Sequence, residues 1–342
     1  MAATIPITLL TGYLGSGKTT LLRRLLAHPE LKDTAVLVNE FGEIALDHQL
    51  LFSATESIVL LDRGCLCCAL RSDLSDQLDQ LYSRRMRKEI PEFQRVVIET
   101  TGLADPAPIL QTLVGEPMIA ALYRLDGVVT TVDGEFGEQE LDEHFESVKQ
   151  ASIADRIVIT KVDRAHAEAL ARLESRLRAL NPAAPIVRAA NGAIEPSAIL
   201  NIGIYNVDGK IAGIEQWLNT NRYRPISADA VLAFGAAQPH DRRIRSFAIV
   251  YDQPVSGTRL WQGLEALIEQ SGERLLRVKG IVNLTGQAQP RVMHIVQHVL
   301  YPVTTLPAWP DEDRRTRLVF IVRDLELSEV QDTLQRALID AG

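Results

Sequence analysis

Residues 12–20, GYLGSGKTT, constrain the fold of this chain more than any other stretch. A short apolar run at 7–10 precedes them, and a leucine-rich helical pattern follows them. The spacing G-x-x-x-x-G-K-[ST] is met by Gly12, Gly17, Lys18 and Thr19. Glycines allow a turn in which successive N–H groups point inward, toward phosphate oxygens. The stretch therefore predicts a strand, a phosphate-binding loop and the start of a helix.

The first two hundred residues alternate between compact apolar runs and helical patterns. Further runs rich in β-branched residues lie at 35–38, 57–61, 95–98, 127–133 and 156–160. Near-continuous apolar strands separated by helices, such as the leucine repeat at 167–180, are typical of a parallel sheet covered on both faces. We therefore expect an α/β fold of the P-loop NTPase type, with a mainly parallel sheet flanked by helices.

The pattern changes in the last third of the chain. Its 342 residues exceed the usual size of one core, so a second domain is expected. We predict a nucleotide domain at 1–205, a linker rich in Gly, Ala, Pro and Asp at 206–240, and a smaller α+β domain at 241–342. Ser256 and Ser328 precede two expected helices of that domain as plausible caps. His294 and His298 are expected to be ordinary side chains of a strand.

Composition excludes several classes of function. A net charge of −8 disfavours binding a nucleic acid backbone, and the short apolar run near the start indicates neither a membrane span nor a secretion signal. The three cysteines are an odd number and lie too close together to join distant parts of a fold. Reduced thiols, and hence a cytoplasmic protein, are expected.

The phosphate loop predicts the catalytic and magnesium-binding groups. Lys18 would supply positive charge to the β- and γ-phosphates, and the Thr19 hydroxyl would bind Mg²⁺. Glu99, at the end of the run RVVIE, would hold the magnesium from a neighbouring strand, and Gly102 would let the chain pass close to the γ-phosphate. The expected nucleotide contacts of the loop are Gly12, Gly15, Ser16, Gly17, Lys18, Thr19 and Thr20.

A base-reading element is expected at residues 160–163, TKVD, directly after a strand. It resembles the N-K-x-D element of GTPases, in which the aspartate accepts two hydrogen bonds from guanine. Asp163 would therefore select GTP, and the Lys161 stem would pack over the base. Thr160 replaces the usual asparagine, so we expect one polar contact to be weakened or rerouted.

Every cysteine of the chain lies in the stretch GCLCC. Three thiolates at Cys65, Cys67 and Cys68 favour Zn²⁺, Cu⁺ or a similarly thiophilic ion, and three sulfurs cannot close a four-thiolate structural site. The segment would have to turn, at Gly64, for all three to meet one ion. The alternatives are small buried side chains or, less favoured, a redox pair of vicinal cysteines.

Taken in order, GYLGSGKTT, VNEFGE, GCLCC, ETTGLADP and TKVD resemble the CobW-type metal-handling GTPases, relatives of HypB and UreG. The resemblance implies slow GTP hydrolysis, with Mg²⁺, coupled to binding of Zn²⁺ or Co²⁺ and its delivery to a client metalloprotein. It also implies a CobW-type C-terminal domain, metal ligands at Cys65, Cys67 and Cys68, and a first switch at 39–47. Val38 stands where some relatives have an acidic ligand, so Glu40 or Glu43 would take that place.

Two other functions fit part of the sequence. A small-molecule kinase would use the same loop, although no arginine-rich lid is apparent. A metal-buffering protein whose metal binding does not depend on nucleotide would use only the three thiols. No Arg or Gln is marked by position as the group that orients the attacking water, so a homodimer or the client could supply one.

Overall fold

The computed structural model describes residues 4–38, 59–61, 72–202, 225–227 and 243–339. Contacts divide the chain into two compact units, one made of residues 1–175 and 184–206, the other of 176–183 and 207–342. Most of the expected linker lies outside the described residues, and residues 225–227 within it form a short strand.

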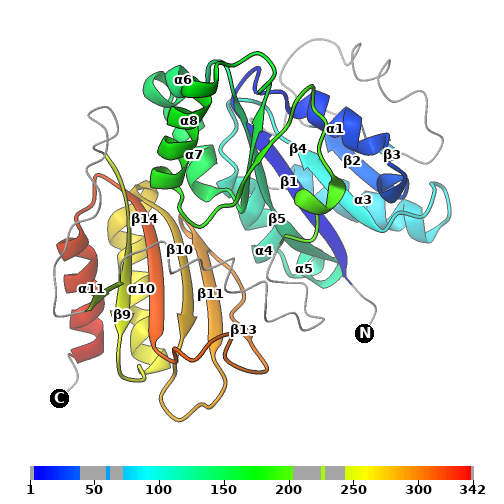
Figure 1. The fold of residues 1–342 in the computed structure, drawn as a ribbon. Helices are drawn as coiled ribbons and strands as arrows, with labels where there is room; N and C mark the ends of the chain where they lie inside the picture. The colour runs from blue at the N-terminus through cyan, green and yellow to red at the C-terminus, as the bar shows by residue number, and fades with distance from the viewer. Residues whose placement is uncertain (1–3, 39–58, 62–71, 203–224, 228–242, 340–342) are drawn as a thin grey trace. The chain divides into compact units, whose positions relative to one another are not determined.

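The described strands of the first unit form one sheet, in which every pair of neighbours is parallel. Its order is β3-β2-β4-β1-β5-β6-β7 (Figure 1), and the expected parallel sheet is confirmed. The strands are β1 (Ile5–Gly12), β2 (Thr34–Val38), β3 (Val59–Leu61), β4 (Arg95–Glu99), β5 (Tyr123–Asp133), β6 (Arg156–Thr160) and β7 (Ile186–Arg188). Because all run the same way, their carboxyl ends meet at one edge.

Helices cover both faces of this sheet (Figure 1). They are α1 (Lys18–Leu26), α3 (Ser72–Met86), α4 (Ala107–Gly115), α5 (Pro117–Leu122), α6 (Gly137–Glu143), α7 (Phe145–Ile153) and α8 (Ala167–Leu180), with short 3₁₀ turns at Pro29–Leu31 and Pro196–Ala198. The leucines of α1 pack on Leu10, Val97 and Val129 of three strands. Since strand side chains alternate, residues such as Leu9 and Val128 face the opposite layer, where α4, α5 and α7 contact β5.

The second unit is built on a sheet that is antiparallel except for its edge strand β8, which runs parallel to β9. Its strands are β8 (Pro225–Ser227), β9 (Ile244–Tyr251), β10 (Leu275–Val282), β11 (Arg291–Val296), β12 (Val299–Leu300), β13 (Thr304–Thr305) and β14 (Thr316–Arg323). Helices α10 (Gly257–Ser271) and α11 (Leu327–Ile339) pack on one face of the sheet. A 3₁₀ turn at Gly272–Arg274 follows α10. The expected smaller α+β module is thus confirmed.

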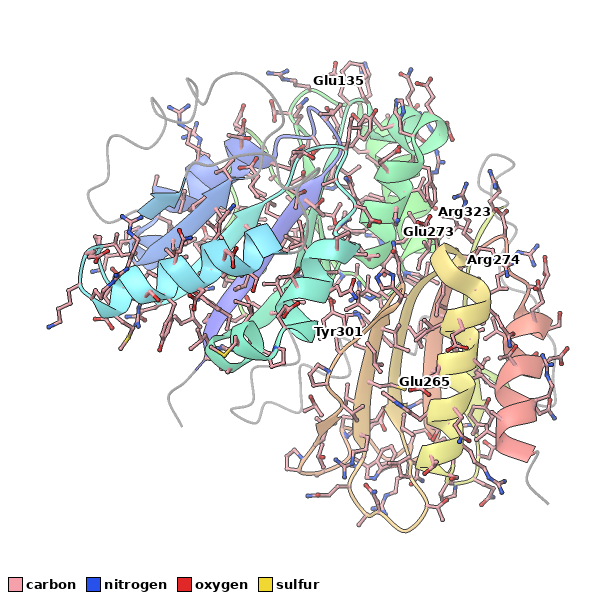
Figure 2. The ribbon with its side chains drawn as sticks, turned by 180° about the vertical axis from the view of Figure 1, so that it is seen from behind. Glu135, Glu265, Glu273, Arg274, Tyr301 and Arg323 are labelled. Atoms are coloured by element: carbon pink, nitrogen blue, oxygen red, sulfur yellow. The ribbon has the colours of Figure 1, made fainter. Side chains whose placement is uncertain are left out.

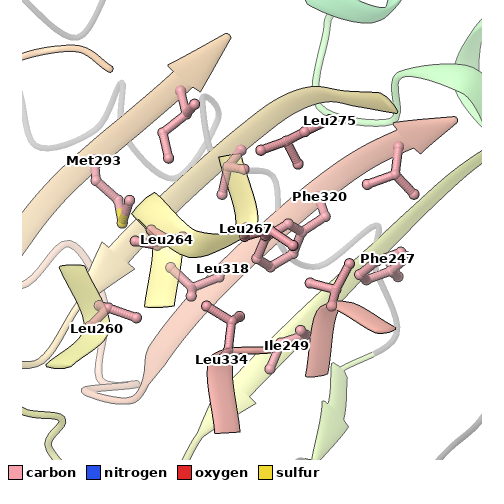
Figure 3. Packing of buried hydrophobic residues seen from close by; sticks show 14 of the residues in the cluster. Phe247, Ile249, Leu260, Leu264, Leu267, Leu275, Met293, Leu318, Phe320 and Leu334 are labelled. Carbon is pink, nitrogen blue, oxygen red and sulfur yellow. The ribbon is translucent and has the colours of Figure 1, made fainter. Parts of the chain in front are cut away.

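The core of the second unit lies between that sheet face and the two helices. Figure 3 shows Phe247 and Phe320 beside Leu264, Leu267 and Leu334. The two phenyl rings stack with centroids 5.5 Å apart. The same spacing of apolar residues that predicted these strands and helices therefore fills one continuous core.

Local details differ from the sequence expectations in two places. Ser256 is the residue before α10, but its side chain makes no capping hydrogen bond. α11 begins at Leu327, before the serine expected to cap it, so Ser328 lies within its first turn. The cap comes instead from Glu329, whose carboxylate accepts the Glu326 N–H at 3.0 Å.

The two histidines also differ from each other. His294 is buried on β11 and stacks on Tyr301 at 4.4 Å, whereas His298 lies in the turn after β11 and is exposed. Among the described residues, no helix has the length and apolar character needed to cross a membrane.

Candidate functional site

The loop between β1 and α1 has backbone angles that only glycine adopts easily. Gly12, Gly15 and Gly17 have φ values of 145°, 73° and 88°. A Cβ on Gly12 would lie 2.2 Å from Thr131 Oγ1, so a larger residue would displace the neighbouring strand β5. Gly15, by contrast, has no atom within 4 Å of that position. The loop is therefore tight against the sheet at Gly12 and open at Gly15, where a ligand could approach the backbone.

Hydroxyl groups fix this loop to the two strands beside it. Ser16 Oγ lies 2.7 Å from Thr131 Oγ1, and Thr160 Oγ1 donates to Ser16 O at 2.6 Å. All three residues are buried. Thr160, which replaces the usual asparagine, thus directs its hydroxyl to the loop backbone.

Lys18 begins α1 and is held over the loop. Its Nζ donates to Gly12 O at 2.9 Å and to Tyr13 O at 3.0 Å, and the residue is 8% exposed. The N-terminus of a helix and an ammonium group therefore converge where N–H groups of the glycine loop are available. This combination stabilises bound anions, phosphate above all.

Thr19 and Glu99 meet across the sheet edge. Thr19 Oγ1 donates to Glu99 Oε1 at 2.6 Å, and Glu99, the last residue of β4, is 3% exposed. A hydroxyl and a buried carboxylate are hard oxygen donors of the kind that Mg²⁺ prefers. The two residues predicted to hold magnesium are therefore in contact and chemically suited to it.

The loop after β4, residues 100–106, lies between the phosphate loop and α7. A Cβ on Gly102 would lie 2.6 Å from the Cα of Leu14, so only glycine permits this approach. On its other side, Gln150 Nε2 donates to Gly102 O and Ala104 O, both at 3.1 Å. Gly102 thus lies directly beside the phosphate loop, where it would be close to the γ-phosphate of a bound nucleotide.

Helix α7, which carries Gln150, also contacts the end of the loop at 100–106 and the phosphate loop. Lys149 Nζ of α7 donates to Asp105 Oδ2 at 2.6 Å. His144, just before α7, stacks on Tyr13 with ring centroids 4.6 Å apart. One helix therefore contacts both segments that would surround a triphosphate.

A cavity of about 240 Å³ opens beside the phosphate loop at the end of β6. Its lining consists of Gly17, Thr20, Arg24, Thr160, Lys161, Asp163, Arg164, Asn191 and Gly192. Asp163 is exposed, and its Oδ1 accepts the Asn191 N–H at 3.0 Å. That hydrogen bond holds the pKa of the Asp163 carboxyl below its ordinary value, so the group is an ionised acceptor at neutral pH. A planar base with adjacent N–H donors would suit this cavity.

Part of this cavity was missed by the sequence analysis. Residues 190–193 form a tight turn after β7, with Ala193 N–H donating to Ala190 O at 2.9 Å and positive φ values of 49° at Asn191 and 73° at Gly192. Gly192 approaches Thr20 of α1 closely. The signal was present as the dipeptide Asn-Gly after a late strand, which is a strong turn signal. No sequence pattern marked Arg24 or Arg164 as lining residues of this cavity.

A larger cavity, of about 620 Å³, lies in the second unit at the end of β9. Tyr251, Asp252 and Arg259 are among its lining residues. Its lining has no glycine loop, and it contains none of the residues that the sequence predicted to bind nucleotide or metal. The smaller cavity carries the phosphate and base elements, and we place the functional site there.

The predicted transition-metal ligands lie outside the described residues. These are Cys65, Cys67, Cys68 and Glu43, together with the first switch at 39–47. Within the part of the chain that the structure describes, no three His, Cys, Asp or Glu side chains form a group that could hold a metal ion. The described segments that flank them are β2, β3 and α3.

Comparison with known proteins identifies the family. Residues 6–188 match the family described as CobW/HypB/UreG, nucleotide-binding domain, and residues 244–338 match the cobalamin synthesis protein CobW C-terminal domain. The chain is 33% identical to the zinc chaperone YjiA of Escherichia coli, over 96% of each chain. It is 30% identical to the zinc chaperone CobW of Pseudomonas aeruginosa, over 98% of this chain and 92% of the relative.

A solved structure supports the same assignment. The crystal structure of the Zn(II)-bound YjiA GTPase from E. coli superposes with a TM-score of 0.71 at 29% identity, covering 97% of this chain and 98% of that one. The resemblance inferred from the sequence motifs is confirmed, in both parts of the chain. The chain therefore belongs to the CobW family.

Proposed function

We propose that this GTPase couples the binding and hydrolysis of GTP to the binding of zinc, or of cobalt, and to its delivery to a client metalloprotein. The contact of Thr19 with Glu99, at 2.6 Å beside the glycine loop, carries the nucleotide half of this proposal. The relatives named as zinc chaperones support the metal half.

Each described residue of the site has a role in this proposal. Gly12, Gly15, Ser16, Gly17 and Thr20 would present backbone N–H groups to the phosphates, and Lys18 would neutralise their charge. Thr19 and Glu99 would hold Mg²⁺, which supplies positive charge for the leaving and transferred phosphates. Gly102 would respond to the γ-phosphate.

The base would occupy the cavity beside β6. Asp163 would accept two hydrogen bonds from guanine, and Lys161 would cover the ring. A base that lacks the two donors would leave the carboxylate without those two hydrogen bonds, and this would discriminate against adenine.

The topology supports a link between nucleotide and metal. β3 ends at Leu61, at the carboxyl edge of the sheet that also holds Lys18 and Glu99, and Cys65, Cys67 and Cys68 follow it in the sequence before α3 begins at Ser72. Glu43 similarly follows β2, which pairs with β4. A triphosphate at this edge can therefore affect the segments on which the thiols lie.

Exposed apolar side chains near the phosphate loop support a protein partner. Leu14 and Leu103 are 52% and 55% exposed, and they belong to the two segments that would surround the γ-phosphate. A client, or a second copy of the chain, could cover them and supply the group that orients the attacking water.

Zinc titration in the presence of each nucleotide tests the proposal. With Mg²⁺ and a non-hydrolysable GTP analogue, zinc affinity should be about 5- to 150-fold higher than with GDP, because coupling of roughly 1–3 kcal/mol is typical of such switches. Competition with a chromogenic chelator measures it, and a variant with serine at all three cysteine positions should lose the tight site.

Two outcomes would contradict the proposal. Equal zinc affinity with GTP analogue and GDP would exclude the switch. Cobalt-loaded protein without a sulfur-to-metal charge-transfer band would exclude thiolate ligation. Lys18→Ala is the matched control, because a nucleotide-independent metal buffer would respond identically with and without this lysine.

A further inference from the structure

Lys161 has an unusual backbone conformation at the base cavity. Its φ of 52° lies in the left-handed region, which costs a non-glycine residue on the order of 1 kcal/mol. The residue begins a turn in which Arg164 N–H donates to Lys161 O at 2.9 Å. This turn brings both Lys161 and Asp163 to the cavity, so something must hold Lys161 in place.

Asp133 makes the contact that does so. Its Oδ2 accepts from Lys161 Nζ at 2.6 Å, and its side chain is 2% exposed whereas that of Lys161 is 28% exposed. The other oxygen, Oδ1, accepts the N–H of Glu135 at 2.8 Å and that of Phe136 at 3.3 Å. The carboxylate is therefore fixed by its own loop before it meets the lysine. Glu135 is labelled on that loop in Figure 2.

The backbones of the two strand ends are joined as well. Asp133 and Thr160 are register partners at the ends of β5 and β6, and Gly134 N–H donates to Thr160 O at 2.9 Å. A Cβ on Gly134 would lie 2.6 Å from that oxygen. The distance between Asp133 and Lys161 is thus set by the sheet and does not depend on a flexible loop.

A second carboxyl group lies close to this pair without replacing Asp133. Burial raises the pKa of Glu140 on α6 to about 7, the charge of Asp133 adds to the shift, and Lys161 and Lys18 oppose it. Glu140 is therefore partly protonated near neutral pH. Asp133 is the carboxylate in direct contact with the lysine.

We propose that Asp133 is a positioning residue for guanine nucleotides, which holds the Lys161 stem along the base cavity through the Lys161 ammonium group. The inference rests on the proposed GTPase function, and it assigns to β5 a part of the base site that the four-residue motif does not contain. Asp133 touches neither base nor phosphate; it acts through Lys161.

The proposal predicts a specific pattern of binding. Asparagine at position 133 can keep the acceptor for the two loop N–H groups, but its NH₂ would face the ammonium group of Lys161 and expel it. GTP and GDP share the same base, so both should bind about 10-fold more weakly, as expected for loss of a charge-assisted hydrogen bond at a partly exposed site. The ratio of their affinities should stay as in wild type.

A double-mutant cycle with Asp133→Asn and Lys161→Met tests the proposal by calorimetric titration of GTP and GDP. Methionine keeps an apolar stem and removes the ammonium group, so Asp133→Asn should cause no further loss in that background. Circular dichroism confirms folding of each variant. Asp133→Ser, which retains a short acceptor, serves as the second variant if asparagine impairs folding.

Glu138→Gln is the matched control. It removes the charge of an ion pair between α6 and Arg172 of α8, at 3.0 Å, outside the cavity. Its affinities should remain within twofold of wild type. Additive losses in the cycle, a changed GTP-to-GDP ratio, or an Asp133→Asn affinity within twofold of wild type would each overturn the inference. A wild-type protein that bound no guanine nucleotide would instead contradict the proposed function.

Discussion

Thr160 illustrates how a changed residue in a motif alters a site. The sequence predicted that one contact of the usual asparagine would be weakened or rerouted, and it could not name the new partner. In the structure, the Thr160 hydroxyl donates to Ser16 O at 2.6 Å and to Val132 O at 3.3 Å. Sequence spacing identifies which residues gather at a site, whereas the direction of a hydroxyl depends on atoms more than a hundred residues away.

Glu140 offers a prediction for pH dependence at the same scale. Burial raises its pKa from 4.5 to about 7, so between these values the folded protein keeps a proton that the unfolded chain has released. Stability from this group should therefore fall as pH rises from about 4.5 to about 7. The free energy of unfolding of Glu140→Gln should therefore increase relative to that of wild type over this pH range, by on the order of 1–2 kcal/mol after solvent screening.

Urea unfolding of wild type and Glu140→Gln at a series of pH values measures this effect. Only the difference between the two proteins matters, because other groups titrate in both. Glu138→Gln on the same helix provides the comparison variant. A difference that stayed constant between pH 4.5 and 7.5 would show that Glu140 does not hold its proton in the folded protein.

At the scale of elements, α7 joins segments that are distant in sequence. Its Gln150 is 1% exposed, and both amide hydrogens go to carbonyl oxygens of the loop at 100–106. The Gln150 backbone carbonyl also accepts from Thr130 Oγ1 at 2.8 Å. The helix thus fastens the loop to β5, a relation that no motif in the sequence indicated.

Replacing Gln150 tests the role of this helix. Gln150→Met keeps the volume but leaves Gly102 O and Ala104 O without their donor, which should cost about 1–3 kcal/mol of unfolding free energy. Hydrogen exchange of the amides at 102–105 should also quicken. Gln139→Met, which removes an exposed hydrogen bond to Glu143, is the control. Unchanged exchange in Gln150→Met would show that α7 does not hold the loop.

The predictability of the elements followed from their burial. Six of the seven described strands of the first unit were predicted, because both of their faces are covered and their apolar runs are nearly continuous. The short edge strand β7, which is not fully buried, was not predicted. α8 was found at 167–180 from its leucine spacing. Helix starts were less well predicted. The cap of α11 comes from Glu329 reaching back, and a serine nearby gave a misleading signal.

At the scale of the whole molecule, the two units have separate cores, and the phosphate and base elements all belong to the first. Binding of GTP with Mg²⁺ should therefore stabilise the first unit directly. At a free concentration one hundred times the Kd, the gain should be about 2.7 kcal/mol. The transition of the second unit should not move.

Hydrogen exchange followed by mass spectrometry can resolve the two units in the full chain. Peptides from β1, β4 and β6 should gain protection with GTP, and peptides from β10, β11 and β14 should keep the same exchange. GDP should give a smaller gain if the γ-phosphate adds contacts. Equal protection of both sheets would show that the units unfold together.

The family and the fold were accessible from the sequence because short motifs recur in a fixed order along it. The base turn at 190–193, the role of Asp133 and the position of α7 were not, because they depend on which strand ends lie side by side. The order β4-β1-β5-β6 decides that arrangement, and local patterns carry little information about order.

The central position of β1 in the sheet matters when a nucleotide is bound. Its neighbours β4 and β5 end in Glu99 and Asp133, and the next strand, β6, leads into Lys161. A single guanine nucleotide would link the ends of β4, β1 and β6, and that of β5 through Lys161, so its departure would remove a cross-link from the middle of the sheet.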